Sequence, residues 1–249
     1  MDFNLPPEAE DAAALAATIL KDHTTTERLI EVEAAGNRFD PVLWKALGDA
    51  GLLSLTTPES HDGAGLGFLE LCRVLVEVGR TVAPVPLATD SVARLFLAER
   101  GTDDQQQAAY TLSVISAAIT EEHEHVPTLP TTTAALDGST FMLTGTKYLV
   151  PAAIDADAFL ITAATPDGTG VFLVDSDASG LQIREQKFPE DAKAPNGNGA
   201  HIPACTHHQY PVACFHLGKG VYRTPGCQRN QHHCRRIYIV EALGLARHF

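Results

Sequence analysis

The sequence predicts an α+β protein, in which an all-helical N-terminal domain is followed by an incomplete antiparallel β-domain and an irregular tail. Three observations support this prediction. Apolar residues recur at helical spacing as far as residue 100, β-branched residues and turn signals recur at short intervals from residue 111, and both patterns fade beyond Phe188. We therefore expect three regions, over residues 1–110, 111–188 and 189–249.

Four helices are expected in the first region. An apolar stripe covers residues 8–23, and Asp40-Pro41 offers an N-cap aspartate followed by proline at the first helical position. Gly51 is well placed to end that second helix. A third stripe begins at Phe68 and ends near Gly79, and a fourth helix over residues 87–100 is closed by Gly101.

The second region is expected to be a compact set of strands. Asp137-Gly138 and the segment 166–170 are turn signals between strand-like runs. The expected strands cover residues 111–117, 131–136, 140–148, 158–165, 171–174 and 181–184. Such short spacing favours antiparallel pairing of neighbours along the chain.

Charge divides the chain near residue 188. Residues 1–188 hold 11 Lys and Arg against 28 Asp and Glu, whereas residues 189–249 hold 7 against 3, and the whole chain has a formal charge of −13. The acidic body argues against a nucleic-acid partner, because little there would neutralise phosphates. The longest apolar stretch is interrupted by Asp155 and Asp157, which argues against a membrane span, and the acidic start does not resemble a signal peptide. A cytoplasmic protein is expected.

The most specific pattern is the segment from Leu47 to Arg80, which contains Ala50-Gly-Leu52, Pro58-Glu59 and Gly63-Ala-Gly-Leu-Gly67. The glycines lack the Lys-Ser/Thr of a P-loop, so on their own they indicate a tight connection between two helices. Together with later motifs, this segment resembles the acyl-CoA dehydrogenase family. Ala118-Ile-Thr-Glu121 resembles that family's "LTEP" motif, and Asp137–Lys147 resembles its "dGdgyvLnGtK" segment. The resemblance covers about residues 5–188.

The resemblance implies a three-domain fold that ends in a helical bundle, with FAD between the β-domain and the bundle. It implies dehydrogenation of an acyl-CoA thioester between its α- and β-carbons in fatty-acid, lipid or sterol side-chain breakdown, with electrons passed to electron-transfer flavoprotein. It places Ile119, Thr120, Tyr148 and Val150 at the flavin. Tyr148 stands where the family has a ring-stacking tryptophan, and Val150 stands where a Ser or Thr hydroxyl meets flavin N5.

The chain departs from this family at several positions. Glu122 and Glu124 replace parts of the "TEPxxGSD" motif and add negative charge, and valine at 150 cannot donate a hydrogen bond. The family's catalytic glutamate lies beyond the matched residues, so no catalytic residue is assigned here. Two interpretations follow: a dehydrogenase that is truncated and inactive alone, or a non-catalytic subunit of a heteromeric dehydrogenase. A homo- or hetero-oligomer is expected in either case.

The tail allows a further hypothesis. It holds four of the five cysteines and seven of the eleven histidines, which could make it a zinc-binding module. Their spacing fits no common zinc motif, so no metal ligand is assigned. The potential ligands are Cys205, His207, His208, Cys214, His216, Cys227, His232, His233 and Cys234. A shifted reading frame, or a genuine but unstructured tail, would also account for the change in composition.

Overall fold

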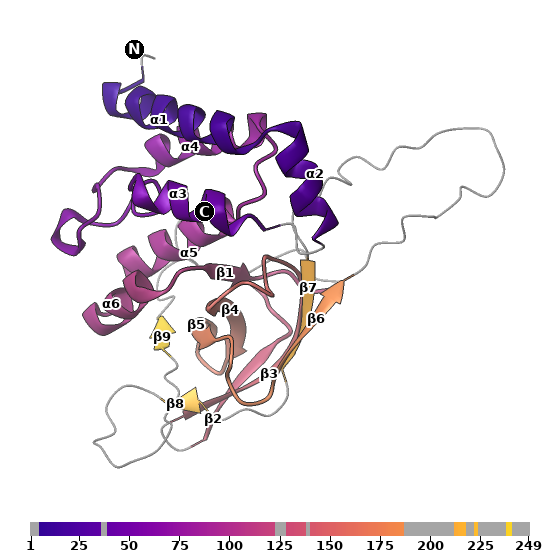
Figure 1. Cartoon of the computed structure of the whole chain (residues 1–249). Coiled ribbons are helices and arrows are strands. Elements are labelled where there is room, and N and C mark those ends of the chain that lie inside the picture. The colour runs from indigo at the N-terminus through magenta and orange to yellow at the C-terminus, as the bar shows by residue number, and fades with distance from the viewer. Residues whose placement is uncertain are drawn as a thin grey trace, which may run out of the picture.

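The computed structural model describes residues 5–35, 39–122, 128–137, 140–186, 212–217, 222–223 and 238–240. Helices gather on one side of the molecule and strands on the other, with α5 and α6 next to β1 (Figure 1). The helices of this part of the chain are α1 (Pro7–His23), α2 (Thr26–Ala34), α3 (Pro41–Asp49), α4 (Phe68–Arg80), α5 (Leu87–Arg100) and α6 (Asp103–Thr111), with a 3-10 turn at Glu59–His61. The predicted fold class, helices first and strands afterwards, is confirmed.

The four expected helices form close to their predicted bounds, although α4 continues one residue past Gly79, to Arg80. The Asp40 carboxylate accepts hydrogen bonds from the backbone N–H groups of Val42 and Leu43, at 2.9 and 3.2 Å, with Pro41 at the first helical position of α3. It also forms two hydrogen bonds with Arg28, each 2.8 Å long, which tie α2 to the start of α3. Gly101 follows α5 directly, as predicted.

Two further helices, α2 and α6, were not expected. Both are short, with nine residues each, so their caps are the clearer signal. The Thr25 hydroxyl accepts a hydrogen bond from the N–H of Arg28 at the start of α2. Thr102 and Gln105 form a reciprocal capping box at the start of α6. Because α6 extends to Thr111, the strand expected from residue 111 begins later, at Ile115.

The strands are β1 (Ile115–Ala118), β2 (Thr133–Asp137), β3 (Thr140–Pro151), β4 (Ala158–Thr165), β5 (Gly168–Asp175), β6 (Leu181–Gln186), β7 (Val212–Leu217), β8 (Tyr222–Arg223) and β9 (Tyr238–Val240). Their order in the sheet is β6-β7-β3-β2-β4-β5-β9, with β1 paired to β4 and β8 to β3. The two predicted hairpins, β2–β3 and β4–β5, are antiparallel. Gly168 has a φ of +131° in the β4–β5 turn, where a side chain would be strained.

The pairing of β1 differs from the antiparallel expectation. It runs parallel to β4, with Ile115 opposite Ala158 and Ala118 opposite Ile161. Its other edge is capped by α5: the Ile115 N–H donates to Asp90 Oδ1 at 2.8 Å, and the Ala117 N–H donates to Thr89 Oγ1 at 2.8 Å. Side chains of a helix therefore replace a second neighbouring strand.

A buried ion pair joins α5 to the residues that lead into β1. Asp90 and Arg94 are both buried, and Arg94 Nε lies 2.7 Å from Asp90 Oδ2. The Arg94 guanidinium also donates to the carbonyls of Ala109, Leu112 and Ser113. From the β-side, Asp157 Oδ2 accepts the Ser113 N–H at 2.6 Å. The chain between α6 and β1 is thus fixed from two directions.

Beyond residue 188 the structure describes only three short strands. The sequence has no sustained strand pattern there, yet β7 pairs with both β3 and β6, and β9 pairs with β5. Residues 238–240 are a strand, although residues 237–249 are the one stretch of the tail whose sequence could form a short helix. Such a helix is excluded for these three residues. The pairing supplied by β3 and β5 is a tertiary effect that local periodicity does not reveal.

The glycine-rich segment between α3 and α4 is the tight connection that its sequence predicted. A Cβ added at Gly63 would lie 2.1 Å from the Thr57 carbonyl oxygen, so only glycine fits there. The N–H groups of Gly65 and Leu66 donate to the carbonyls of Thr57 and Leu55, at 2.8 and 2.9 Å. These amides are occupied within the loop, which excludes them as a phosphate cradle.

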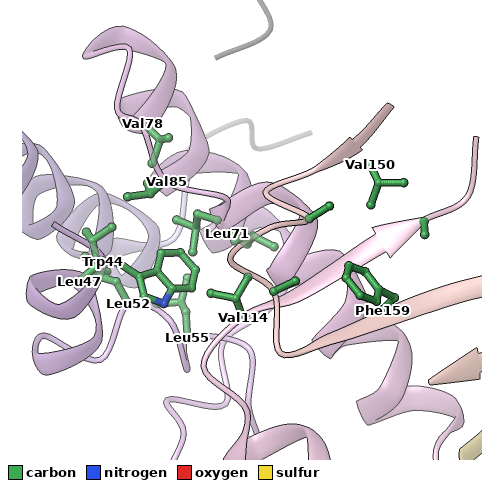
Figure 2. Packing of buried hydrophobic residues seen from close by; sticks show 14 of the residues in the cluster. Trp44, Leu47, Leu52, Leu55, Leu71, Val78, Val85, Val114, Val150 and Phe159 are labelled. Atoms are coloured by element: carbon green, nitrogen blue, oxygen red, sulfur yellow. The ribbon is translucent and has the colours of Figure 1, made fainter. Parts of the chain in front are cut away.

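One hydrophobic cluster continues from the helices into the sheet. In Figure 2, Val114 lies beside Trp44 of the helical side, and the same cluster extends to Val150 and Phe159 on the strand side. Trp44 is buried within this cluster. A second, smaller cluster packs α5 and α6 against β1, β4 and β5. No helix of the described residues is long and apolar enough to cross a membrane.

Candidate functional site

The residues predicted to meet a cofactor gather where the chain leaves β1 and passes β3. Ile119 and Thr120 follow β1 directly, and Tyr148 and Val150 belong to β3. The Tyr148 N–H donates a 2.8 Å hydrogen bond to the Thr120 carbonyl. Thr120 and Tyr148, which are far apart in the sequence and were both predicted to contact the flavin, therefore lie side by side. We call Ile119, Thr120 and Tyr148 the β1–β3 edge.

The side chains of the β1–β3 edge are accessible to different degrees. Ile119 is exposed, and Thr120 and Tyr148 are half-buried. The Tyr148 hydroxyl donates a hydrogen bond to Glu122 Oε2 at 3.0 Å, which orients the phenol ring. Glu122 therefore lies against the edge as a hydrogen-bond acceptor. Glu124, the second added charge, lies outside the described residues.

Val150 occupies a different environment. Its side chain is fully buried and belongs to the hydrophobic cluster that joins helices and sheet (Figure 2). A ligand at the β1–β3 edge could reach Val150 only through its backbone. The placement of Val150 at a flavin stays a prediction, as do those of the other three residues.

Strand β3 is irregular at this point. Its register with β7 shifts between Lys147 and Val150, and Leu149 has a φ of +53°. A β-branched or bulky residue in this left-handed region is uncommon, and such irregularities re-aim side chains in a sheet. The shift separates an inward-facing Lys147 from an inward-facing Val150, and it places Tyr148 beside Thr120.

A buried ionic network lies beneath the edge. Lys147 is fully buried, and its Nζ lies 2.7 Å from Glu121 Oε1 and 3.0 Å from Thr162 Oγ1. The Glu121 carboxylate also accepts the N–H groups of Thr131 and Thr132, at 2.6 and 3.0 Å, together with both of their hydroxyls. Glu121 therefore binds both β3 and the segment before β2, and Lys147 links this carboxylate to β4.

The electrostatics of the network follow from this geometry. Burial raises the pKa of the Glu121 carboxyl, but hydrogen bonds from Lys147, Thr131 and Thr132 outweigh burial and lower the pKa to about 2. Burial lowers the pKa of the Lys147 ammonium, and its contact with Glu121 opposes that lowering. Glu121 is therefore ionised at neutral pH and is a poor proton acceptor.

Sequence reasoning used Glu121 and Lys147 only as parts of matching motifs and did not predict their contact. A signal was available in β3. Leu143 and Lys147 are both buried positions of β3, four residues apart, so they share a face of the strand. A lysine on an inward face requires an anionic partner. The sequence could not say which of the many carboxylates supplies it.

The residues of the edge fit part of a flavin. A half-buried aromatic ring, a hydroxyl and an exposed aliphatic side chain suit the edge and face of a planar heterocycle. Glu122 is unfavourable to an anionic pyrophosphate, which would have to lie away from it. Among the described residues there is no cluster of three or more potential metal ligands. Most tail cysteines and histidines lie outside the described residues, and only the backbones of Cys214 and His216, in β7, are described.

Comparison with known proteins identifies the family of the chain. Residues 6–114 match the family model of the acyl-CoA dehydrogenase N-terminal domain. The acyl-CoA dehydrogenase FadE27 of Mycobacterium tuberculosis is 36% identical over 189 residues, which are 74% of this chain and 50% of that protein. The chain belongs to the acyl-CoA dehydrogenase family.

Solved acyl-CoA dehydrogenases show the same fold. A variant of the Tcur3481-Tcur3483 steroid ACAD is 35% identical, with a TM-score of 0.75, and the match covers 86% of this chain and 55% of that one. The ChsE4-ChsE5 complex from Mycobacterium tuberculosis is 30% identical, with a TM-score of 0.74, over 89% and 56% of the two chains. A glutaryl-CoA dehydrogenase from Mycobacterium smegmatis in complex with FADH2, 20% identical with a TM-score of 0.70, shows the likeness of fold alone. This chain spans about half the length of the relatives it matches.

Proposed function

We propose that this chain contributes the β1–β3 edge to the FAD site of an acyl-CoA dehydrogenase. The observation that supports the proposal is the 2.8 Å bond from the Tyr148 N–H to the Thr120 carbonyl, which brings two family flavin positions together. Bound FAD would supply the hydride acceptor for α,β-dehydrogenation of an acyl-CoA thioester. Tyr148 would lie against the ring, Thr120 and Ile119 would line its border, and Val150 would act through its backbone.

We propose a role for each region of the chain on this basis. Residues 1–110 are the helical domain, residues 111–188 carry the flavin edge, and residues 189–249 have no assigned role. The resemblance to the family extends to about residue 188 and does not include the segment of the catalytic glutamate. Glu121 is held ionised within its network and does not fill that role. We therefore propose that the proton-accepting carboxylate comes from outside the matched segment.

FAD titration of the purified full chain tests the proposal. We expect the fluorescence of FAD to be quenched on binding, and we expect Tyr148→Ser to weaken binding by at least about tenfold, because base–aromatic stacking contacts of this kind contribute roughly 1–3 kcal/mol. Tyr110→Ser is the matched control, since Tyr110 is also half-buried but packs against His61 in the helical region. Equal FAD affinity of wild type and Tyr148→Ser would refute the assignment of Tyr148.

A second candidate function is that of a subunit in a heteromeric acyl-CoA dehydrogenase acting on a steroid-derived acyl-CoA. It is favoured by the names of two matched structures, a steroid ACAD named for two proteins and the ChsE4-ChsE5 complex. Electron-transfer flavoprotein is the electron acceptor that the family resemblance implies.

This candidate predicts that the chain purifies colourless and acquires flavin on mixing with a full-length acyl-CoA dehydrogenase subunit. Gel filtration coupled to flavin absorbance measures both properties at once. A yellow, active preparation of the chain alone would refute it. Failure to retain FAD both alone and in a mixed complex would refute the FAD proposal as a whole.

A further inference from the structure

We propose that the buried Glu121–Lys147 ion pair is a positioning element, which holds Thr120 and Tyr148 side by side and so sets the geometry of the proposed flavin edge. The inference rests on the proposed function for its purpose, but its structural part can be tested without FAD. Glu121 and Lys147 are the immediate neighbours of Thr120 and Tyr148 in sequence. The two pairs face opposite ways: the ion pair is buried, and Thr120 and Tyr148 are partly exposed.

Regular sheet pairing does not define this contact. Among the described strands, β1 is paired with β4 and not with β3. The Tyr148 N–H therefore meets the Thr120 carbonyl outside any ladder, at the place where the register of β3 shifts. A ladder would fix the position of Tyr148 through several bonds in a row. Here the ion pair, one residue away on each chain segment, adds a restraint to the hydrogen bond that the Ser116 hydroxyl of β1 donates to the Pro151 carbonyl at the end of β3.

The network is built to hold the position of Glu121. Its two oxygens receive donors from Lys147, Thr131 and Thr132, so neither oxygen can turn without losing bonds. Gly145 of β3 allows Thr132 to lie close, because a Cβ at position 145 would be 2.4 Å from Thr132 Oγ1. The segment before β2, the end of β1 and the middle of β3 are thereby locked together.

The chemistry of the pair also argues for a role in positioning. Taking two charges out of water is costly, and apolar residues of similar volume often serve a core equally well or better. What an ion pair adds is a single preferred geometry, since displacement by one position leaves a buried charge without its partner. A site that must hold a planar ring against Tyr148 benefits from that restraint.

Three shape-matched variants of the full chain test the inference: Glu121→Gln, Lys147→Met and the double variant. The readout is amide hydrogen exchange of Tyr148, measured relative to the amide of Phe159 in the core of β4, which reports wider opening. We expect the relative exchange of Tyr148 to rise by at least about tenfold in each variant. The double variant is decisive, because removing both charges together leaves no buried charge without its partner while the restraint is lost.

Asp40→Asn provides the matched control. It also converts a buried carboxylate with an arginine partner to an amide, but in the helical region. We expect it to lower global stability without raising the exchange of Tyr148 relative to Phe159. Unchanged relative exchange of Tyr148 in the double variant, or an equal rise in Asp40→Asn, would overturn the inference.

FAD titration of the same proteins separates this inference from the proposed function. If wild type binds FAD, we expect the affinity of the double variant to fall by about tenfold or more and that of Asp40→Asn to stay within about twofold. If no protein binds FAD while the exchange of Tyr148 rises as expected, the positioning role stands and the flavin function fails. If FAD binds equally to all of them, the edge is not set by the ion pair and the inference fails.

Discussion

Removing the Asp90 carboxylate is expected to be among the most damaging single changes in this chain. Asp90 is fully buried and accepts three hydrogen bonds: 2.7 and 3.1 Å from the Arg94 guanidinium and 2.8 Å from the Ile115 N–H. In Asp90→Ala the guanidinium keeps its carbonyl partners but loses its counter-charge. The first N–H of β1 also loses its acceptor.

The magnitude follows from these losses. Breaking a buried ion pair by removing one partner costs about 3–5 kcal/mol, and an orphaned buried N–H costs roughly 1–3 kcal/mol. The two terms overlap because both arise from one carboxylate, so we expect a loss of about 4 kcal/mol in the free energy of unfolding. Small domains have about 5–15 kcal/mol in total. Asp90→Asn should cost less, because its amide oxygen can still accept from Ile115.

Urea unfolding followed by circular dichroism and by the fluorescence of Trp44, the single tryptophan, measures this loss. Asp49→Ala is the control: Asp49 pairs with Lys45 on the surface, where both side chains are largely exposed, and its removal should cost at most about 0.5 kcal/mol. A loss below about 1 kcal/mol in Asp90→Ala would show that the junction between α5 and β1 does not depend on this carboxylate.

Three further predictions concern the β-region. Although burial opposes the change, hydrogen bonds from Lys147, Thr131 and Thr132 lower the pKa of Glu121 from its ordinary value of 4.5 to about 2. The ionised carboxylate should therefore stabilise the fold above pH 4.5 by about 3 kcal/mol, a contribution that is lost as pH falls from about 5 toward 2. Acid titration of urea midpoints should show this loss in wild type and not in Glu121→Gln. Gly145→Ala should lower the free energy of unfolding by about 1–3 kcal/mol, because the added Cβ would collide with Thr132. Gly79→Ala in α4 should raise it by up to about 1 kcal/mol, because no atom lies within 4 Å of the added Cβ. Thermal melts of the two variants compare them directly. Glu122→Gln should strengthen FAD binding at low salt, and the gain should vanish at high salt if it is electrostatic; an equal gain at both salt concentrations contradicts that reason.

Much of the fold could be read from the sequence because its signals are local. Asp40-Pro41 and Gly101 mark helix ends by backbone chemistry, and the β4–β5 hairpin follows from its turn residues. The parallel pairing of β1 could not be read in this way. It depends on a helix that caps its other edge, and no periodicity within residues 115–118 reports this.

The candidate site could likewise be predicted only in part from the sequence. Family motifs pointed to Thr120 and Tyr148, and the structure brings their backbones into contact. The pairing of Lys147 with Glu121 depends on which of many carboxylates lies opposite an inward lysine, which is a property of the folded chain. Burial of Val150 likewise depends on a shift in the register of β3 that no single residue announces.

The way α5 caps β1 has a consequence for dissecting this protein. A fragment that begins near residue 111 would retain every strand of the β-region but would lack the acceptors that Asp90 and Thr89 provide to Ile115 and Ala117. Its first strand would expose an unpaired edge, which is a template for association between copies. A fragment of the β-region should therefore begin after Arg80 and before α5, so that it includes both β1 and the helix that caps its edge.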